Sequence, residues 1–218
     1  FLPLDARLRR GRWAGVVPHG DLIGLTMGVV GFGRIGATLV AGAQAFGVRL
    51  IGIRGSRREE APPAGVDFLG GPQDLGRVLE ESDIVVVSCP LNEATRGLIG
   101  KAELARMKPT AFLLNVARGP VVDEEALYNA VKGGVIAGAG IDVWYQYPAN
   151  LEDTCLPSRF PFQELENVLF SPHVSGWSVE TRRNRMKVIA RNIDHVARGE
   201  EPENVVHTPA PLPDWRKL

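Results

Sequence analysis

Seven short runs of mostly apolar residues alternate with helix-like segments between Met27 and Ser171. Most of the runs show no alternation of apolar and polar residues, which is typical of strands buried on both faces. Strands that alternate with helices predict an α/β fold in which one doubly wound parallel sheet lies between two layers of helices, α/β/α. The expected strands are 27–31, 48–53, 66–69, 83–88, 111–116, 135–141 and 167–171.

Helices are expected between these strands and after the last of them. The internal helices are predicted at 34–46, 73–81, 101–107 and 123–132, with Gly47 and Gly133 as C-caps. A long loop is expected at 145–166, and a final helix at 178–197, with Ser178 as its N-cap and Gly199 at its end. An apolar stripe is expected along this helix, formed by Val179, Met186, Ile189, Ile193 and Val196. The expected organisation is an N-terminal arm or helix at 1–24, the sheet domain at 25–177 and a C-terminal helix and tail at 178–218.

The charge and cysteine content limit the classes of partner. Lys and Arg number 25 and Asp and Glu also number 25, so we expect neither nucleic acid nor a membrane surface as a partner. Cys89 and Cys155 lie far apart and lack metal-ligand spacing, so we predict no metal site and no disulfide scaffold. Because no disulfide scaffold is expected, a reducing cytoplasm is the expected location. No apolar run approaches the roughly 20 residues of a membrane helix, so insertion in a membrane is not expected.

A glycine pattern, G-x-G-x-x-G, spans Gly31, Gly33 and Gly36 where a predicted strand meets a predicted helix. Gly31 would allow the tight turn, Gly33 the close approach of a pyrophosphate, and Gly36 close packing of helix and strand. The helix start at Arg34 and Ile35 would present backbone N–H groups to the phosphates. The setting predicts a Rossmann-type dinucleotide site and makes the segment 25–177 a dinucleotide-binding Rossmann domain.

The second predicted strand is followed by basic residues rather than an acid. An NAD-binding protein usually has an acid about 20 residues after the glycines, where it binds the ribose 2′-hydroxyl. Here Arg54, Ser56, Arg57 and Arg58 follow the strand, and guanidinium and hydroxyl groups suit the 2′-phosphate of NADP. NADP(H) is therefore the expected cofactor, with NAD(H) possible; the alternative is that these residues form a solvated loop.

Four downstream segments together resemble the D-2-hydroxyacid dehydrogenases, a family that includes glyoxylate/hydroxypyruvate reductases. They are Cys89–Arg96, Asn115–Gly119, Gly140–Trp144 and Ser171–Trp177, and the resemblance runs from about Leu8 to Val206. It implies an NAD(P)-dependent oxidoreductase that transfers a hydride between nicotinamide and a small 2-oxo or 2-hydroxy acid.

The resemblance also implies roles for individual residues. Arg118 matches the arginine that binds the substrate carboxylate, and its planar guanidinium suits a 2-oxo acid. His173 matches the acid/base histidine, and Asp142 the residue that holds the nicotinamide carboxamide. Further positions expected to line the cofactor cleft are Cys89, Pro90, Thr95, Val116, Ala117 and Gly176, and Arg118 and His173 are also expected to contact the cofactor.

Tyr147 stands where the family pattern has a glutamate that pairs with the catalytic histidine. A neutral tyrosine can hydrogen-bond the imidazole but cannot stabilise imidazolium as a carboxylate does, so we expect a lower pH optimum for reduction. Alternatively, a carboxylate of the long loop could replace the glutamate, from Glu152, Asp153 or Glu164. Formate dehydrogenases also lack this glutamate, but they place a glutamine there, so formate is a minor option.

The resemblance covers little of the substrate-binding domain, which family members build mainly from about a hundred residues before the segment that matches Leu8–Trp13. Cofactor binding is therefore expected to survive better than turnover. The competing function is a dinucleotide-binding module without catalysis, such as a sensor. The apolar stripe expected on the last helix suggests a homodimer.

Overall fold

The computed structural model describes residues 2–13, 15, 20–55, 61–150 and 152–205. It divides into two compact units, Phe1–His173 and Val174–Leu218, which are described separately below. The division expected from the sequence, at 24 and 177, stays a prediction. Within the described residues, no helix is both long and apolar enough to span a membrane.

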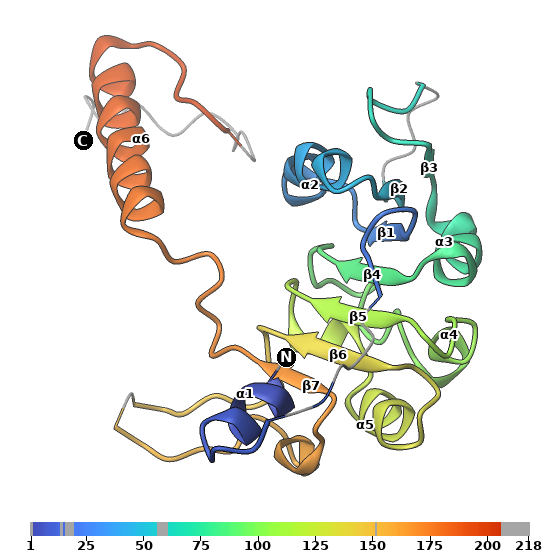
Figure 1. The fold of residues 1–218 in the computed structure, drawn as a ribbon. Coiled ribbons are helices and arrows are strands. Elements are labelled where there is room, and N and C mark those ends of the chain that lie inside the picture. Colours follow the sequence, from blue (N-terminus) through green and yellow to red (C-terminus); the bar gives the residue numbers. More distant parts are fainter. Residues whose placement is uncertain (1, 14, 16–19, 56–60, 151, 206–218) are drawn as a thin grey trace. The chain divides into compact units, whose positions relative to one another are not determined.

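All seven predicted strands are present in the first unit. Its elements are α1 (Leu2–Leu8), β1 (Thr26–Val30), α2 (Arg34–Ala45), β2 (Arg49–Ile53), β3 (Phe68–Gly70), η1 (Pro72–Asp74), α3 (Leu75–Glu81), β4 (Ile84–Val87), α4 (Lys101–Leu104), β5 (Phe112–Asn115), η2 (Gly119–Val121), α5 (Glu124–Lys132), β6 (Gly138–Ile141), η3 (Phe162–Glu164) and β7 (Val168–Phe170). The strands form one parallel sheet in the order β3-β2-β1-β4-β5-β6-β7 (Figure 1). The predicted doubly wound α/β fold is confirmed.

Helices cover both faces of the sheet, as the buried strands require. On one face α3, α4 and α5 enclose the larger core, which includes Val85, Leu113 and Ile141 (Figure 1). On the other face α2 covers a smaller core around Val29 and Leu50. The switch of crossover direction between β1 and β4 opens a crevice at the carboxyl ends of the strands, where sheets of this kind bind ligands.

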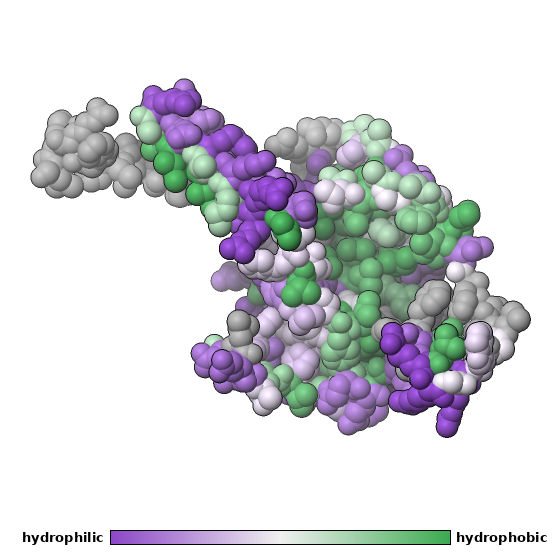
Figure 2. Space-filling view, turned by 60° about the vertical axis from the view of Figure 1, so that its left-hand side comes forward, coloured by the Kyte–Doolittle hydropathy of each residue, from purple (hydrophilic) through white to green (hydrophobic). Residues whose placement is uncertain are grey.

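The face shared by β5, β6 and β7 on the α2 side carries exposed apolar residues. Phe112 is 47% exposed and Leu169 is 54% exposed, and the register places Leu169 in line with Gly140 and Leu114. Apolar surface of this unit is visible in the space-filling view (Figure 2). The sheet is thus fully packed on its α3–α5 side and only partly packed on the other.

One expectation about the connections needs correction. The segment 145–166, expected to be a loop, contains η3 and buries Phe162 completely, because Phe162 packs edge-on against Tyr128 and Trp144. Gly133 is the C-cap of α5, as expected; it keeps a helical conformation, and the left-handed glycine is Gly134 after it. Gly47, with a positive φ of 65°, follows α2 as expected.

The second unit contains α6 (Val179–Arg198), which begins and ends as the sequence predicted. The Ser178 side chain accepts a hydrogen bond from the Thr181 N–H, and Gly199 closes the helix in a left-handed conformation. No residue of α6 is buried, and the expected stripe of Val179, Met186, Ile189, Ile193 and Val196 is exposed.

Candidate active site

The glycine turn joins the carboxyl end of β1 to the start of α2. Gly31 has a positive φ of 98°, and a Cβ there would come within 2.4 Å of the Cys89 backbone nitrogen, so only glycine fits. A Cβ on Gly36 would press against Val29 and Phe32 at 3.1–3.3 Å, which explains the close packing of α2 on the sheet. A Cβ on Gly33 would meet no atom within 4 Å, so the backbone is open to a ligand at that point.

The start of α2 has features that suit an anion. Among the described residues, no side chain caps this helix, and its first turn carries no acidic residue. Its N-cap is Gly33, followed by the exposed residues Arg34 and Ile35. A helix start of this kind directs backbone N–H groups and a positive dipole end outward.

A cavity of about 550 Å³ lies beside this turn. It is lined by Ile35, Ser88, Cys89, Pro90, Leu91, Val116, Ala117 and Arg118. Six of these residues were predicted from the sequence as cofactor-binding; Ser88 and Leu91 were missed. Ser88 donates a hydrogen bond of 2.9 Å to the Gly31 carbonyl and so ties β4 to the glycine turn.

Cys89 lines the cavity, and Thr95 lies in the same segment after β4 and contacts Pro90. Burial raises the pKa of the Cys89 thiol, so the thiol stays protonated and is a packing group rather than a nucleophile. The Thr95 hydroxyl donates to the Pro90 carbonyl at 2.6 Å and accepts from the Asn92 N–H at 2.9 Å. Thr95 therefore orders the turn that carries Pro90.

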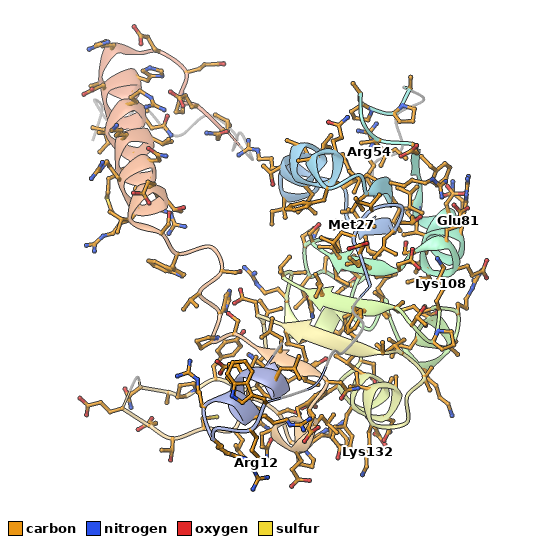
Figure 3. The ribbon with its side chains drawn as sticks, viewed as in Figure 1. Arg12, Met27, Arg54, Glu81, Lys108 and Lys132 are labelled. Atoms are coloured by element: carbon orange, nitrogen blue, oxygen red, sulfur yellow. The ribbon has the colours of Figure 1, made fainter. Side chains whose placement is uncertain are left out.

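The residues expected near the ribose are only partly described. Arg54 follows β2 directly, with its side chain half-buried, and its backbone N–H donates to the Gly70 carbonyl at 3.1 Å (Figure 3). Ser56 and Arg57, and Arg58 after them, lie outside the described residues.

The carboxyl ends of β5 and β6 are joined by a buried asparagine for which no role was predicted from the sequence. Asn115 is 1% exposed; its amide donates to the Arg118 carbonyl at 3.2 Å and its side-chain oxygen accepts from the Ala117 N–H at 3.1 Å. The Asn115 carbonyl accepts from the Asp142 N–H at 3.1 Å. A polar side chain that ends a buried strand was the signal for this role.

The exposed Arg118 side chain folds back so that its guanidinium donates to the Ala117 carbonyl at 2.6 Å. Gly119 follows, and a Cβ there would come within 2.3 Å of the Trp144 carbonyl oxygen. The backbone after Arg118 is therefore packed directly against the segment after β6.

The carboxyl ends of β6 and β7 are joined in the same way. The buried Asp142 carboxylate accepts a hydrogen bond of 2.5 Å from the Ser171 hydroxyl, and the Trp144 indole N–H donates to the Ser171 carbonyl at 2.9 Å. Ser171 lies two residues before His173. The hydrogen bonds thus run from the Arg118 loop through Asp142 to the His173 loop, across three neighbouring strands.

His173 contacts Tyr147, as the family resemblance implied. The Tyr147 oxygen lies 3.2 Å from His173 Nδ1, and it also accepts the Trp144 backbone N–H at 2.9 Å. Of the alternative carboxylates, Asp153 accepts hydrogen bonds from Asn150 instead, and Glu152 and Glu164 are exposed. Gly176 belongs to the second unit, so its expected place in the cofactor cleft stays a prediction.

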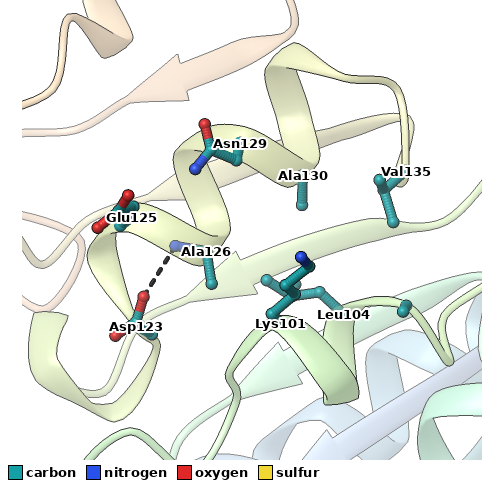
Figure 4. A pocket seen from close by; sticks show the side chains of 9 residues that line it. Lys101, Leu104, Asp123, Glu125, Ala126, Asn129, Ala130 and Val135 are labelled. Atoms are coloured by element: carbon teal, nitrogen blue, oxygen red, sulfur yellow. Dashed lines mark hydrogen bonds between the residues drawn. The ribbon is translucent and has the colours of Figure 1, made fainter.

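A second hollow, of about 500 Å³, lies between α4 and α5 (Figure 4). Leu104, Ala126, Ala130 and Val135 supply apolar lining, while Asp123 uses its carboxylate to cap α5 at Ala126. None of the predicted catalytic or cofactor-binding residues lines it.

Comparison with known proteins gives a consistent result. The family model described as D-isomer specific 2-hydroxyacid dehydrogenase, NAD binding domain, matches residues 1–175. A glyoxylate reductase of Korarchaeum cryptofilum is 41% identical over 210 residues, which is 93% of this chain and 60% of the relative. A D-3-phosphoglycerate dehydrogenase of Methanocaldococcus jannaschii is 36% identical over 94% of this chain and 37% of its own length.

Solved structures with the same fold contain either dinucleotide. A D-isomer specific 2-hydroxyacid dehydrogenase from Xanthobacter autotrophicus Py2, in complex with NADPH and MES, is 34% identical with a TM-score of 0.76 and covers 94% of this chain and 79% of that one. One from Lactobacillus delbrueckii ssp. bulgaricus in its NAD-complexed form is 28% identical with a TM-score of 0.80, over 94% of this chain and 63% of that one. The chain spans about 60% of the length of the glyoxylate reductases that it matches.

Proposed function

The chain belongs to the D-isomer specific 2-hydroxyacid dehydrogenases, as their NAD-binding domain, and from this premise we propose that it serves hydride transfer between NAD(P) and a small 2-oxo acid. The observation that carries the proposal is the line of hydrogen bonds from the Arg118 loop through Asp142 to the His173 loop. Neighbouring strands lie about 4.8 Å apart, so the ends of β5 and β7 are about 10 Å apart, which supports a role for both loops at one small substrate.

The glycine turn and the neighbouring cavity fit a dinucleotide. Gly31 leaves room for the chain to turn, Gly33 is open to close approach, and the N-terminus of α2 favours a pyrophosphate. Ile35, Pro90 and Val116 would border the rest of the cofactor. A bound nicotinamide would donate or accept the hydride.

Arg118 and His173 would act on the substrate. The Arg118 guanidinium would leave the Ala117 carbonyl and bind the carboxylate of a 2-oxo acid through two parallel hydrogen bonds. His173 would exchange a proton with the substrate oxygen, while Asp142, oriented by Ser171, would face the nicotinamide carboxamide. A small acid such as glyoxylate or hydroxypyruvate is the proposed substrate.

NADP(H) is the preferred cofactor in this proposal. Arg54 lies at the end of β2, the position from which an acidic residue would bind the ribose 2′-hydroxyl of NAD. A guanidinium there favours the 2′-phosphate through charge-assisted hydrogen bonds. A homodimer and a cytoplasmic location also stay predictions; light scattering of the purified chain tests the first.

Calorimetric titration of the purified chain with NADPH and NADH, followed by NADPH oxidation with a panel of 2-oxo acids, tests the function. We expect tighter binding of NADPH, and turnover that His173→Ala lowers at least a hundredfold. His195→Ala is the matched control, because His195 lies in the last turn of α6 in the other unit.

Binding without turnover would select the alternative function, a dinucleotide-binding module. Absence of heat with both dinucleotides would overturn the proposal. Preference for NADH would overturn only the assignment of NADP(H).

A further inference from the structure

The His173 imidazole and the Tyr147 hydroxyl form a hydrogen bond whose direction has a chemical consequence. We propose that Tyr147 is a positioning residue that donates its hydroxyl hydrogen to His173 Nδ1 and so places the single proton of the neutral imidazole on Nε2. The proposal rests on the function proposed above and defines the state of its histidine.

The Trp144 backbone N–H determines how Tyr147 can bond. This N–H can only donate, and it points to the Tyr147 oxygen at 2.9 Å. Trp144 itself is held firmly: it is 5% exposed, stacks on Phe170 with ring centroids 4.6 Å apart, and donates its indole N–H to the Ser171 carbonyl. Tyr147 therefore receives one hydrogen bond from a fixed donor.

The Tyr147 hydroxyl has one hydrogen of its own to place, and His173 Nδ1 lies 3.2 Å from its oxygen. A phenol oxygen is a weak acceptor because its lone pair is delocalised into the ring, whereas an unprotonated imidazole nitrogen is a strong acceptor. Accepting from Trp144 also polarises the hydroxyl and strengthens its own donation. The chain of bonds therefore runs from Trp144 N–H through the Tyr147 hydroxyl to Nδ1.

The backbone at His173 supports a positioning role. His173 has a positive φ of 59°, one of two such non-glycine residues in the described part of the chain. This left-handed conformation is uncommon for residues with a Cβ, and it is often found where a functional side chain is held in a set direction. Because Tyr147 occupies Nδ1, Nε2 is the nitrogen left for a substrate.

A tyrosine at this position gives the histidine a different tautomer from the one expected with the glutamate of the family pattern. A carboxylate can only accept, so it would hold a proton on Nδ1 and leave Nε2 with a lone pair, ready to act as a base. A donating tyrosine leaves Nε2–H facing the substrate, so the neutral imidazole donates a hydrogen bond to a carbonyl oxygen. The resting site is then arranged to receive a 2-oxo acid.

Nitrogen NMR of the chain labelled with ¹⁵N-histidine tests the proposal directly, at a pH about two units above the ordinary histidine pKa of about 6.5. Two-bond and three-bond couplings to the ring hydrogens identify which nitrogen carries the proton. The His173→Asn variant identifies the His173 signals by their disappearance. We expect the Nε2–H pattern in wild type, a mixture of tautomers in Tyr147→Phe, and the Nδ1–H pattern in Tyr147→Glu.

A control separates tautomer selection from general damage to the loop. Tyr145→Phe removes a hydroxyl from the same segment, where it bonds to the Val122 carbonyl, and should leave the His173 pattern unchanged. An Nδ1–H pattern in wild type, or an unchanged pattern in Tyr147→Phe, would overturn the inference. Loss of dinucleotide binding with the expected NMR patterns would instead refute the proposed function and leave the tautomer assignment intact.

Discussion

At the carboxyl end of β1 the structure depends on glycine, which has no side chain. At the carboxyl ends of β5, β6 and β7 it depends instead on hydrogen bonds made by polar side chains and the backbone. The glycine turn leaves no room for a Cβ at Gly31. On the other side, Asn115, Asp142 and Ser171 join three loops through their polar groups. The first region suits a large anionic ligand that lies against the backbone, and the second holds reactive side chains in fixed positions.

This comparison predicts that a larger side chain destabilises the glycine turn, and that loss of a polar side chain destabilises the loops after β5, β6 and β7. The largest effect is expected for Gly31→Ala, since the new Cβ would overlap the Cys89 backbone and the φ of 98° is unfavourable for alanine. We expect the free energy of unfolding to fall by about 2–5 kcal/mol and dinucleotide binding to be lost. Urea unfolding and calorimetry measure the two effects.

Gly33→Ala is the matched control for the glycine turn. Its Cβ would meet no atom within 4 Å, so stability should change by about 0.5 kcal/mol or less while dinucleotide affinity falls. Equal stability of both variants would contradict the steric account of Gly31, and unchanged affinity in Gly33→Ala would show that no phosphate approaches there.

In the second region, Asn115→Ala removes the amide that holds the Arg118 loop. We expect a loss of about 1–3 kcal/mol in the free energy of unfolding, because the Ala117 N–H and the Arg118 carbonyl lose a buried partner. Denaturant unfolding measures the loss. Asn129→Ala, on the exposed side of α5, should change stability by about 0.5 kcal/mol or less, and a similar loss in both variants would argue against the role of Asn115.

Arg54→Ala tests the proposed preference for NADP(H). If Arg54 binds the 2′-phosphate, its loss removes a charge-assisted hydrogen bond of roughly 1.5–3 kcal/mol, so the Kd for NADPH should rise about 10–100-fold. The Kd for NADH should change by about threefold or less. Arg106→Ala, which breaks an exposed ion pair with Glu80, should alter neither constant, and a parallel rise for both dinucleotides in Arg54→Ala would contradict the assignment.

The smallest effect is expected at the amino ends of the strands, where Asp83 accepts hydrogen bonds from Lys108 and from the Thr26 N–H. Figure 3 labels Lys108. Burial raises the pKa of Asp83, but these hydrogen bonds outweigh it and hold the pKa below its ordinary value. The stabilisation is therefore present above the unfolded pKa of about 3.9 and is lost as the pH falls through the lower folded value.

Lys108→Met should accordingly lower the free energy of unfolding by about 0.5–1 kcal/mol at pH 7, and the difference from wild type should shrink as the pH falls below the unfolded pKa of about 3.9. Unfolding curves at several pH values measure this. Lys101→Met, at the exposed start of α4, should show no such pH dependence, and a constant difference for Lys108→Met would exclude the ion pair as its cause.

Much of the fold could be predicted from the sequence because its signals are local. Apolar runs, the glycine pattern and the capping residues Ser178 and Gly199 each act within a few neighbouring residues, and all seven strands appeared where expected. The burial of Phe162 was not predicted, because a single apolar residue in a long polar segment shows no periodicity. Only its contacts with Tyr128 and Trp144, which are distant or separate in the sequence, explain why it is buried.

The sequence by itself determined the order of strands and helices and the place of the glycine turn, and its resemblance to a family indicated that Tyr147 would face His173. The tertiary structure alone decided that Asn115, Asp142 and Ser171 join three strand ends, and that the Trp144 N–H fixes how Tyr147 bonds. The physical reason is that strand propensity and turns depend on adjacent residues, whereas hydrogen-bond partners and their direction depend on groups that only the folded sheet brings together.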